Sequence, residues 1–190
     1  MKIVLLLLLF CSVVWGQKIL FPGVTEESFP RYFDIHRSEF VSVVGTNPKL
    51  SFVPTSMVQK LYHEIGTTSI VSEDARVFLA RQGLGESLVI IPELIEYTIA
   101  PRRRFVVASQ LEGVLTMRYT LFDLATLEQR FTTVVTATTS KNHGFIFLRP
   151  LRQSVTITAT DQNEMTRTMI TSQIDSFVDV VEPVLMSLLQ

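Results

Sequence analysis

The sequence has little cysteine and almost no excess of either charge. Its 190 residues contain one cysteine, and 17 lysines and arginines are balanced by 18 aspartates and glutamates, for a formal net charge of -1. Binding to nucleic acid or to an anionic membrane requires a concentrated basic surface that can release counterions. The composition therefore argues against a nucleic-acid-binding protein.

Long apolar runs are also absent, except at the amino terminus. Met1 and Lys2 precede an almost wholly apolar run from Ile3 to Val14, and Val14-Trp15-Gly16 suits cleavage before Gln17. The run is shorter than the roughly 18 residues of a membrane-spanning helix. We predict a secretory signal peptide at residues 1–16, with an uncleaved anchor as the alternative. No later segment is long and apolar enough to span a bilayer, so membrane contact is expected to be peripheral at most.

The single cysteine, Cys11, lies inside this predicted signal peptide. Phe10 occupies the preceding position, where a lipoprotein signal carries a small residue, so we do not expect lipidation. The mature chain would then have no thiol, and its stability would depend on its core alone. This favours the bacterial periplasm, or association with the outer membrane, over a disulfide-rich secreted scaffold.

The mature chain, residues 17–190, shows no repeat and no flexible linker, which predicts a single domain. Its first part, residues 17–54, is irregular, with candidate strands at Lys18–Phe21 and Phe40–Val44. The aromatic residues Phe29, Tyr32, Phe33 and Phe40 are interpreted either as core or as the lip of a binding site.

Two short helices are indicated by their caps. Ser56 and Gln59 form a capping-box pattern at the start of a helix over residues 57–65. Ser72 is the expected N-cap of a second helix, which Gly83 closes.

A strand-rich region follows. It is predicted to contain strands at Leu88–Tyr97, Phe105–Phe122, Arg130–Thr139, Phe145–Leu148 and, at an edge, Ser154–Thr160, with turns at Ile99–Arg104 and Lys141–Gly144. Pro92 cannot donate to a strand ladder and so indicates a bulge or an edge position. Alternation in the long strand predicts one apolar and one wet face.

The carboxy-terminal segment, about residues 163–189, carries an apolar stripe at helical spacing, with Pro183 as an expected kink or break. The order of these elements predicts an α+β fold, in which a mixed or mostly antiparallel sheet is covered by two short helices and a long C-terminal helix. A lipocalin-like barrel is the competing fold, because residues 105–160 are rich in strands.

Residues suited to catalysis or to binding a metal are scattered. His36, His63 and His143 are isolated from other ligand-type residues, and no phosphate-binding loop or nucleophile motif occurs. Glu93 and Glu96 would project from opposite faces of a straight strand, and with Glu86 they are interpreted as a solvated face. We therefore expect no enzyme activity, no cofactor and no metal.

The triplet Arg102, Arg103 and Arg104 is the densest charge in the sequence. Guanidinium groups pair bidentately with carboxylates and phosphates, so these three residues are the predicted partner-binding site. The alternative is a basic hairpin tip that keeps a strand end soluble.

A resemblance to a known group of proteins rests on the stretch from Thr68 to Thr133. Ser69–Ser72, Arg81–Gly85 and Leu88–Tyr97, with Gly85-Glu86-Ser87 and the phrase from Leu121 to Glu128, resemble the bacterial envelope α/β domain of the curli-secretion, TolB amino-terminal and penicillin-binding-protein-activator type. The layout is also similar to auxiliary subunits of envelope transporters. The resemblance implies a non-enzymatic scaffold that docks other envelope proteins.

These observations together predict an exported, periplasmic accessory or assembly protein of the cell envelope that acts through contacts with an envelope protein. One alternative is a carrier of a small apolar ligand held between the sheet and the final helix. A second alternative is a hydrolase with an unrecognised site. The sequence leaves open whether the protein forms a homo-oligomer.

Overall fold

The computed structural model describes residues 18–21, 33–45, 50–65, 71–105, 108–145 and 157–188. The predicted signal peptide, including Cys11, lies outside these residues, as do Phe29 and Tyr32. The described residues form one five-stranded sheet with the order β2-β1-β3-β4-β5. The short strands β1 (Lys18–Leu20) and β2 (Ser51–Phe52) pair in parallel with each other, and β1 pairs in parallel with β3.

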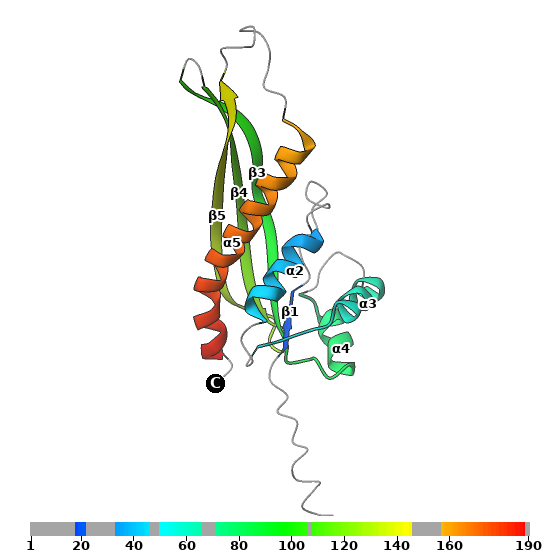
Figure 1. Cartoon of the computed structure of the whole chain (residues 1–190). Coiled ribbons are helices and arrows are strands. Elements are labelled where there is room, and N and C mark those ends of the chain that lie inside the picture. The colour runs from blue at the N-terminus through cyan, green and yellow to red at the C-terminus, as the bar shows by residue number, and fades with distance from the viewer. Residues whose placement is uncertain are drawn as a thin grey trace, which may run out of the picture.

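Three long antiparallel strands dominate the sheet. β3 (Leu88–Phe105), β4 (Ala108–Asp123) and β5 (Glu128–Phe145) pair along almost their whole lengths and extend well beyond the short strands (Figure 1). Together with the helices, this mixed sheet confirms the predicted α+β class. The early helices and the open sheet exclude the lipocalin-like barrel that we considered as the competing fold.

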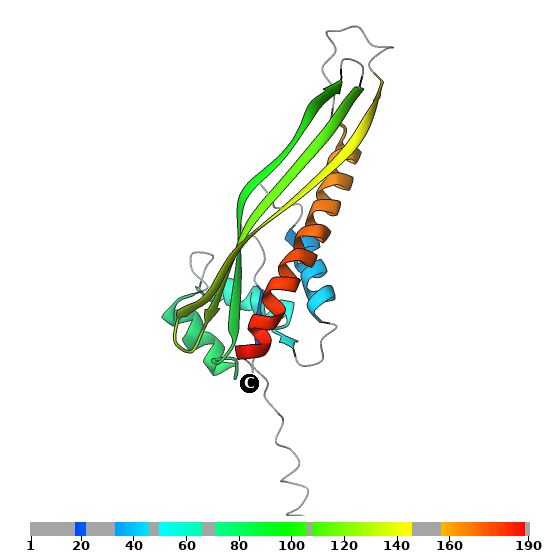
Figure 2. The same cartoon turned by 90° about the vertical axis from the view of Figure 1, so that its left-hand side faces the viewer.

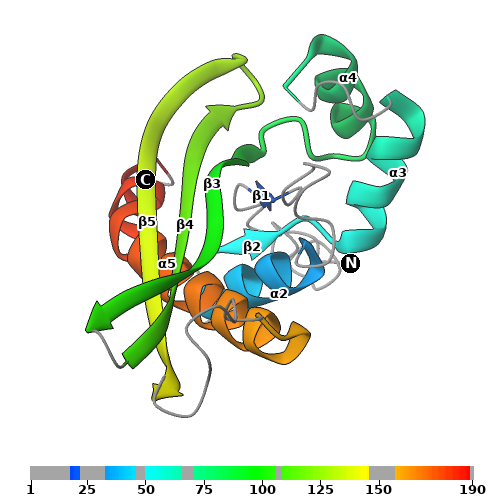
Figure 3. The same ribbon diagram turned by 90° about the horizontal axis from the view of Figure 1, so that it is seen from above.

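Helices cover both faces of the sheet at one end and a single face at the other. α2 (Phe33–Val44) and α5 (Ala159–Leu188) pack together on one face, whereas α3 (Thr55–Ile65) and α4 (Glu73–Arg81) lie beside the base of the long strands (Figures 1 and 3). α5 runs along the three-stranded ribbon formed by β3, β4 and β5 (Figure 2). No helix of the described residues lies against the other side of the ribbon's upper part (Figure 2). The three predicted covering helices are confirmed as α3, α4 and α5, and α2 adds a fourth among the described residues.

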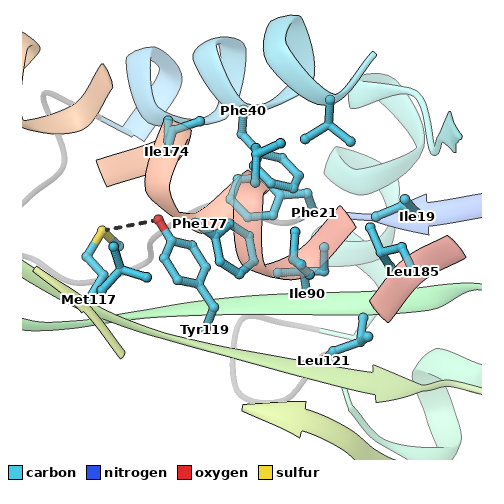
Figure 4. Close-up of a cluster of buried hydrophobic side chains, with 14 of the residues drawn as sticks. Ile19, Phe21, Phe40, Ile90, Met117, Tyr119, Leu121, Ile174, Phe177 and Leu185 are labelled. Carbon is cyan, nitrogen blue, oxygen red and sulfur yellow. Dashed lines mark hydrogen bonds between the residues drawn. The ribbon is translucent and has the colours of Figure 1, made fainter. Parts of the chain in front are cut away.

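The main hydrophobic core lies between the sheet and the α2–α5 pair. Tyr119 from β4 stacks on Phe177 from α5 with ring centroids 3.7 Å apart, and Phe21 stacks on Phe40 from α2 at 4.2 Å (Figure 4). These rings are almost wholly buried. Because large aromatic side chains bury much area, this contact fixes both helices to the same sheet face. Phe40 therefore belongs to the core, which confirms the core interpretation for this residue.

A second, smaller core lies under α3 and α4. Leu61 from α3 and Leu79 from α4 pack there with Leu20 and Val89, which belong to adjacent strands. Since side chains alternate along a strand, Leu20 and Val89 point away from the main core, toward which Ile19 and Ile90 point. The base of the sheet is thus buried on both faces.

The structure shows how the two short helices α3 and α4 begin and how α4 ends. The Ser72 hydroxyl accepts a hydrogen bond from the Ala75 amide at 3.2 Å, and Gly83 has a φ of 71°, the left-handed conformation expected after a helix. Both predictions for this helix are confirmed. α3 begins at Thr55, one residue before the serine that we expected to cap it.

Four predictions about local structure were wrong. Phe40–Val44 is helical in α2, where His36, Phe40 and Val44 recur at a spacing of four and are buried against the core. Ile99–Arg104 and Lys141–Gly144 are strand, because β3 and β5 stay paired with β4 beyond them. At these two predicted turns, pairing with the neighbouring strand outweighs the local turn propensity.

The fourth error concerns the predicted edge strand Ser154–Thr160. Residues 151–156 lie outside the described part, and α5 begins at Ala159 with Thr158 before it. The Thr158 hydroxyl accepts a hydrogen bond from the Asp161 amide at 3.1 Å and donates one to its carboxylate at 2.6 Å. This is a capping arrangement, and together with Lys141 it lowers the pKa of Asp161 to about 2. Pro183 lies within α5 and does not end it.

Candidate interaction surface

The candidate site is the sheet face opposite α5, which we call the outer face. Register and alternation assign to it the even-numbered residues of β4 from Glu112 to Thr120, together with their partners on β3 and β5. Hydroxyl side chains predominate there and are exposed or half-exposed: Thr98, Thr116, Thr120, Thr132, Thr136, Thr138 and Ser140. A face rich in hydroxyl groups offers many hydrogen-bond donors and acceptors.

The hydroxyls form cross-strand pairs. Thr116 and Thr136 lie with their Oγ1 atoms 3.1 Å apart, and Thr120 and Thr132 lie 3.4 Å apart. Val134 separates these pairs on β5 and is 53% exposed, one of the most exposed large apolar side chains among the described residues. Along β5, exposed threonines thus lie on both sides of the exposed Val134. A second polypeptide can contact the hydroxyls and the apolar side chain together.

Four of the charged groups on the outer face form two ion pairs. Arg118 donates to the Glu93 carboxylate at 2.8 Å, and Arg102 donates to Glu112 at 2.7 Å. The hydrogen bond that Arg102 donates to Glu112 raises the pKa of Arg102 above its ordinary value. Exposed ion pairs of this kind contribute little stability, so their main effect is to leave the outer face nearly neutral.

Glu93 and Glu96 project from the same face, contrary to our prediction. Ile95 is the extra residue of a β-bulge between Leu94 and Glu96, and it moves Glu96 to the side on which Glu93 lies. Glu93 is held by Arg118, and Glu96 and Glu86 are exposed. The interpretation of these carboxylates as a solvated face therefore stands, although the argument from opposite faces does not.

The three arginines lie near the end of β3 that is farthest from α3 and α4 (Figure 1). Arg102 pairs across the sheet with Gln110, and Arg103 with Ser109, and a register irregularity follows between Arg103 and Phe105. They are strand residues close to the ribbon's tip. Arg102 is already bound to Glu112, and the binding of a partner by Arg102, Arg103 and Arg104 stays a prediction.

Sequence reasoning missed a buried polar cluster under the outer face. The Tyr119 hydroxyl donates to the Gln173 side-chain oxygen at 2.6 Å and lies 2.8 Å from His36 Nε2. Burial raises the pKa of Tyr119 and lowers that of His36 to about 4, while the Gln173 side chain partly opposes the shift at His36. His36 lies 83 positions before Tyr119 in the sequence, and Gln173 lies 54 positions after it, so no local sequence pattern indicates that the three side chains meet. The cluster links α2, β4 and α5, so its role here is structural.

The other histidines are not brought together. His63 is exposed on α3, and His143 lies near the end of β5. Within the described ranges, no three His, Cys, Asp or Glu side chains are grouped so as to hold a metal ion. In the same part of the chain, every helix is too short or too polar to cross a bilayer.

Comparisons with known proteins identify the fold. No protein-family model matches the chain, and no curated protein matches it significantly. Among solved structures, the hypothetical protein CT253 from Chlamydia trachomatis is similar, with 10% identity and a TM-score of 0.52 over 90% of this chain and 99% of that one. At this identity the similarity establishes a shared fold only.

Two solved lipoproteins are also similar. A minor lipoprotein from Acinetobacter baumannii has 10% identity and a TM-score of 0.47, over 86% of this chain and 89% of that one. Lipoprotein GNA1162 from Neisseria meningitidis has 11% identity and a TM-score of 0.46, over 88% and 99%. The narrower relationship to the curli-secretion, TolB amino-terminal and penicillin-binding-protein-activator groups stays a prediction.

Proposed function

We propose that the protein is an exported, non-enzymatic accessory or assembly protein of the bacterial cell envelope that acts by binding another envelope protein. Export is supported by the signal-peptide pattern of residues 1–16. The main support for a binding role is the exposure of the outer face. Three long strands extend beyond the part of the sheet covered by α3 and α4, and the outer face of that extension has no described helix against it (Figure 2).

The chemistry of the outer face favours a protein partner. Its hydroxyls and its exposed Val134 suit a second polypeptide surface, which can satisfy many donors and acceptors at once. Glu93 and Glu112 on this face are each held by an arginine, which supports a binding role over a catalytic one. The arginine triplet at the tip adds a site for acidic side chains of the partner.

The alternative of an apolar-ligand carrier is less well supported. Such a ligand was expected between the sheet and the final helix, but α5 packs there directly through Met169, Ile170 and Phe177, which are buried against the sheet. A Cβ added at Gly113 on β4 would already come within 2.9 Å of the Met169 sulfur. The protein's own side chains therefore fill the space between the sheet and α5 at this point.

Site-specific photocrosslinking in the native envelope tests the proposal. A photoreactive residue at Thr116, in the middle of the outer face, is expected to give a discrete adduct with one envelope protein. The matched position is Ser172, which is exposed on α5, and it should give none. Equal adducts from both positions, or a small molecule retained by the purified protein in native mass spectrometry, would contradict the proposed role.

A further inference from the structure

The two outermost long strands differ in how their free edges are protected. Past Val89, the pairing of β1 with β3 ends, so the rest of the β3 edge has no partner strand among the described residues. This edge carries Pro92 and Pro101, which have no amide N–H, and the bulge at Ile95. Prolines and bulges are the devices with which natural proteins prevent an edge from pairing.

The β5 edge lacks such devices over its central part. Between Phe131 and Ser140 the strand has no charged residue, no proline and no glycine, and its pairing with β4 is regular throughout. A described neighbour exists on one side of β5 only. A long, uncharged edge rich in β-branched residues is a template for another strand.

We propose that a second copy of this chain occupies the β5 edge, with the two β5 strands antiparallel and Val135 facing Val135 across a two-fold axis. This pairing joins the two sheets into one continuous sheet, with both copies of α5 on the same face. Along it, Thr132 lies opposite Thr138, and Val134 opposite Thr136. Threonine pairs of this kind already stabilise the sheet within one chain, as at Thr116 and Thr136.

Charge complementarity at the ends of the strand selects this register and this occupant. Arg130 is an extra residue in β5, since Leu121 pairs with Phe131 and Phe122 with Gln129. Counting past this bulge, Glu128 of one copy lies opposite Lys141 of the other, and the two-fold axis produces the contact twice. Both residues are on the α5 side of the sheet, since they pair with Asp123 and Leu111 of β4.

Both groups can make the contact. The Glu128 side chain is 63% exposed; one of its carboxylate oxygens lies 3.1 Å from Arg130, and a carboxylate has further acceptor sites for a second cation. The Lys141 side chain is 35% exposed. Lys141 Nζ has three donors, of which Asp161 at 2.9 Å and Glu164 at 2.6 Å take two. The third donor is left for Glu128 of the second copy. An interface in which the same strand supplies both sides is the isologous kind found in two-fold dimers.

Cysteine cross-linking tests the pairing and its register in the purified full chain. In a Cys11→Ser background, V134C mixed with T136C should give a disulfide-linked dimer, because these positions face each other across the axis. Either variant alone should cross-link much less. T116C, on the same face but on the interior strand β4, is the matched control and should stay unlinked. A register shifted by one pair would instead link V134C or T136C to itself, and that result would overturn the proposal.

Charge substitution provides the second measurement. Val134→Lys with Thr136→Lys places lysine opposite lysine twice, and should weaken the dimer by about tenfold or more in analytical ultracentrifugation. Thr98→Lys with Ala100→Lys adds the same charge to exposed positions on β3 and should leave the dimer unchanged. A wild-type chain that is monomeric at roughly 100 µM, where a Kd of about 1 µM would give nearly complete association, excludes the dimer. The assay needs no envelope partner, so its failure leaves the proposed function to its own test.

Discussion

The Tyr119 hydroxyl donates a hydrogen bond to the Gln173 side-chain oxygen at 2.6 Å, which joins the central strand of the sheet to the C-terminal helix. His36 Nε2 lies 2.8 Å from the same hydroxyl and adds α2 to the contact. The three groups are buried, so each depends on the others for its hydrogen bonds. This cluster holds both core helices to the ribbon that presents the outer face.

Removal of the Tyr119 hydroxyl is expected to destabilise the protein. Tyr119→Phe keeps the stacked ring but leaves Gln173 Oε1 and His36 Nε2 without their partner, which costs about 1–3 kcal/mol of the free energy of unfolding. Chemical denaturation measures the loss. Thr138→Val removes an exposed hydroxyl and should change stability by about 0.5 kcal/mol or less. Equal losses in the two variants would show that the Tyr119 hydroxyl contributes no more to the free energy of unfolding than an exposed hydroxyl does.

Stability is expected to fall as the solution is acidified. Burial lowers the pKa of His36 from 6.5 to about 4, so between these values the unfolded chain binds more protons than the folded one. Lowering the pH from 7 to 4 should therefore cost on the order of 3 kcal/mol at this residue, from the 1.36 kcal/mol that each pKa unit represents. Above about pH 7.5 the pH should have no effect through His36, because the imidazole is then neutral in the folded and unfolded states.

Two histidine variants separate this effect from the titration of carboxylates. His36→Gln should lose most of the decrease in stability between pH 7 and pH 5, where most carboxylates stay ionised. His63→Gln, at an exposed position on α3, should keep it. Denaturation curves at several pH values give the comparison, and parallel pH profiles for His36→Gln and the wild type would contradict the assignment.

The cap of α4 gives a local prediction. Ser72→Ala removes the acceptor of the Ala75 amide and should lower stability by about 1 kcal/mol, as loss of an N-cap usually does. Ser56→Ala is the control, since Ser56 lies inside α3 and is exposed, and its effect should be about 0.5 kcal/mol or less. A larger loss for Ser56→Ala in thermal or chemical unfolding would mean that it is Ser56 that caps α3.

The arginine triplet is tested by replacing Arg102, Arg103 and Arg104 with serine. The fold should persist, because the exposed pair between Arg102 and Glu112 contributes little stability, and circular dichroism checks this. Capture of the envelope partner should weaken, most strongly at low salt, where charges are screened least. If capture equals that of the wild type at low and at high salt, the triplet is only a solubilising strand end.

Export is tested by the mature amino terminus. Expression of the full chain in a bacterium should yield a protein that begins at Gln17, as determined by intact mass or by amino-terminal sequencing. Replacement of Gly16 with a bulky residue should block cleavage, because signal peptidase requires small residues near its site. A chain that retains residues 1–16 after export would favour the uncleaved anchor.

The sequence by itself determined those elements whose evidence is local. The α4 helix was predictable from Ser72 and Gly83, since a capping hydroxyl and a left-handed glycine act within one turn of the chain. The long C-terminal helix was predictable from its apolar stripe, and the wet face of β4 from its alternation. The arginine triplet could be named from sequence, but its place on a strand could not.

Tertiary structure alone decided the features that depend on distant residues. Phe40–Val44 has strand-forming composition but is helical, because α5 and the sheet bury its helical stripe. Lys141–Gly144 has turn-forming residues but stays in β5, because β4 pairs beside it. The bulge at Ile95, which brings Glu93 and Glu96 to one face, and the contact of Tyr119 with Gln173 arise in the same way. Local propensities differ by about 1 kcal/mol, and burial and cross-strand pairing outweigh them once the chain has folded.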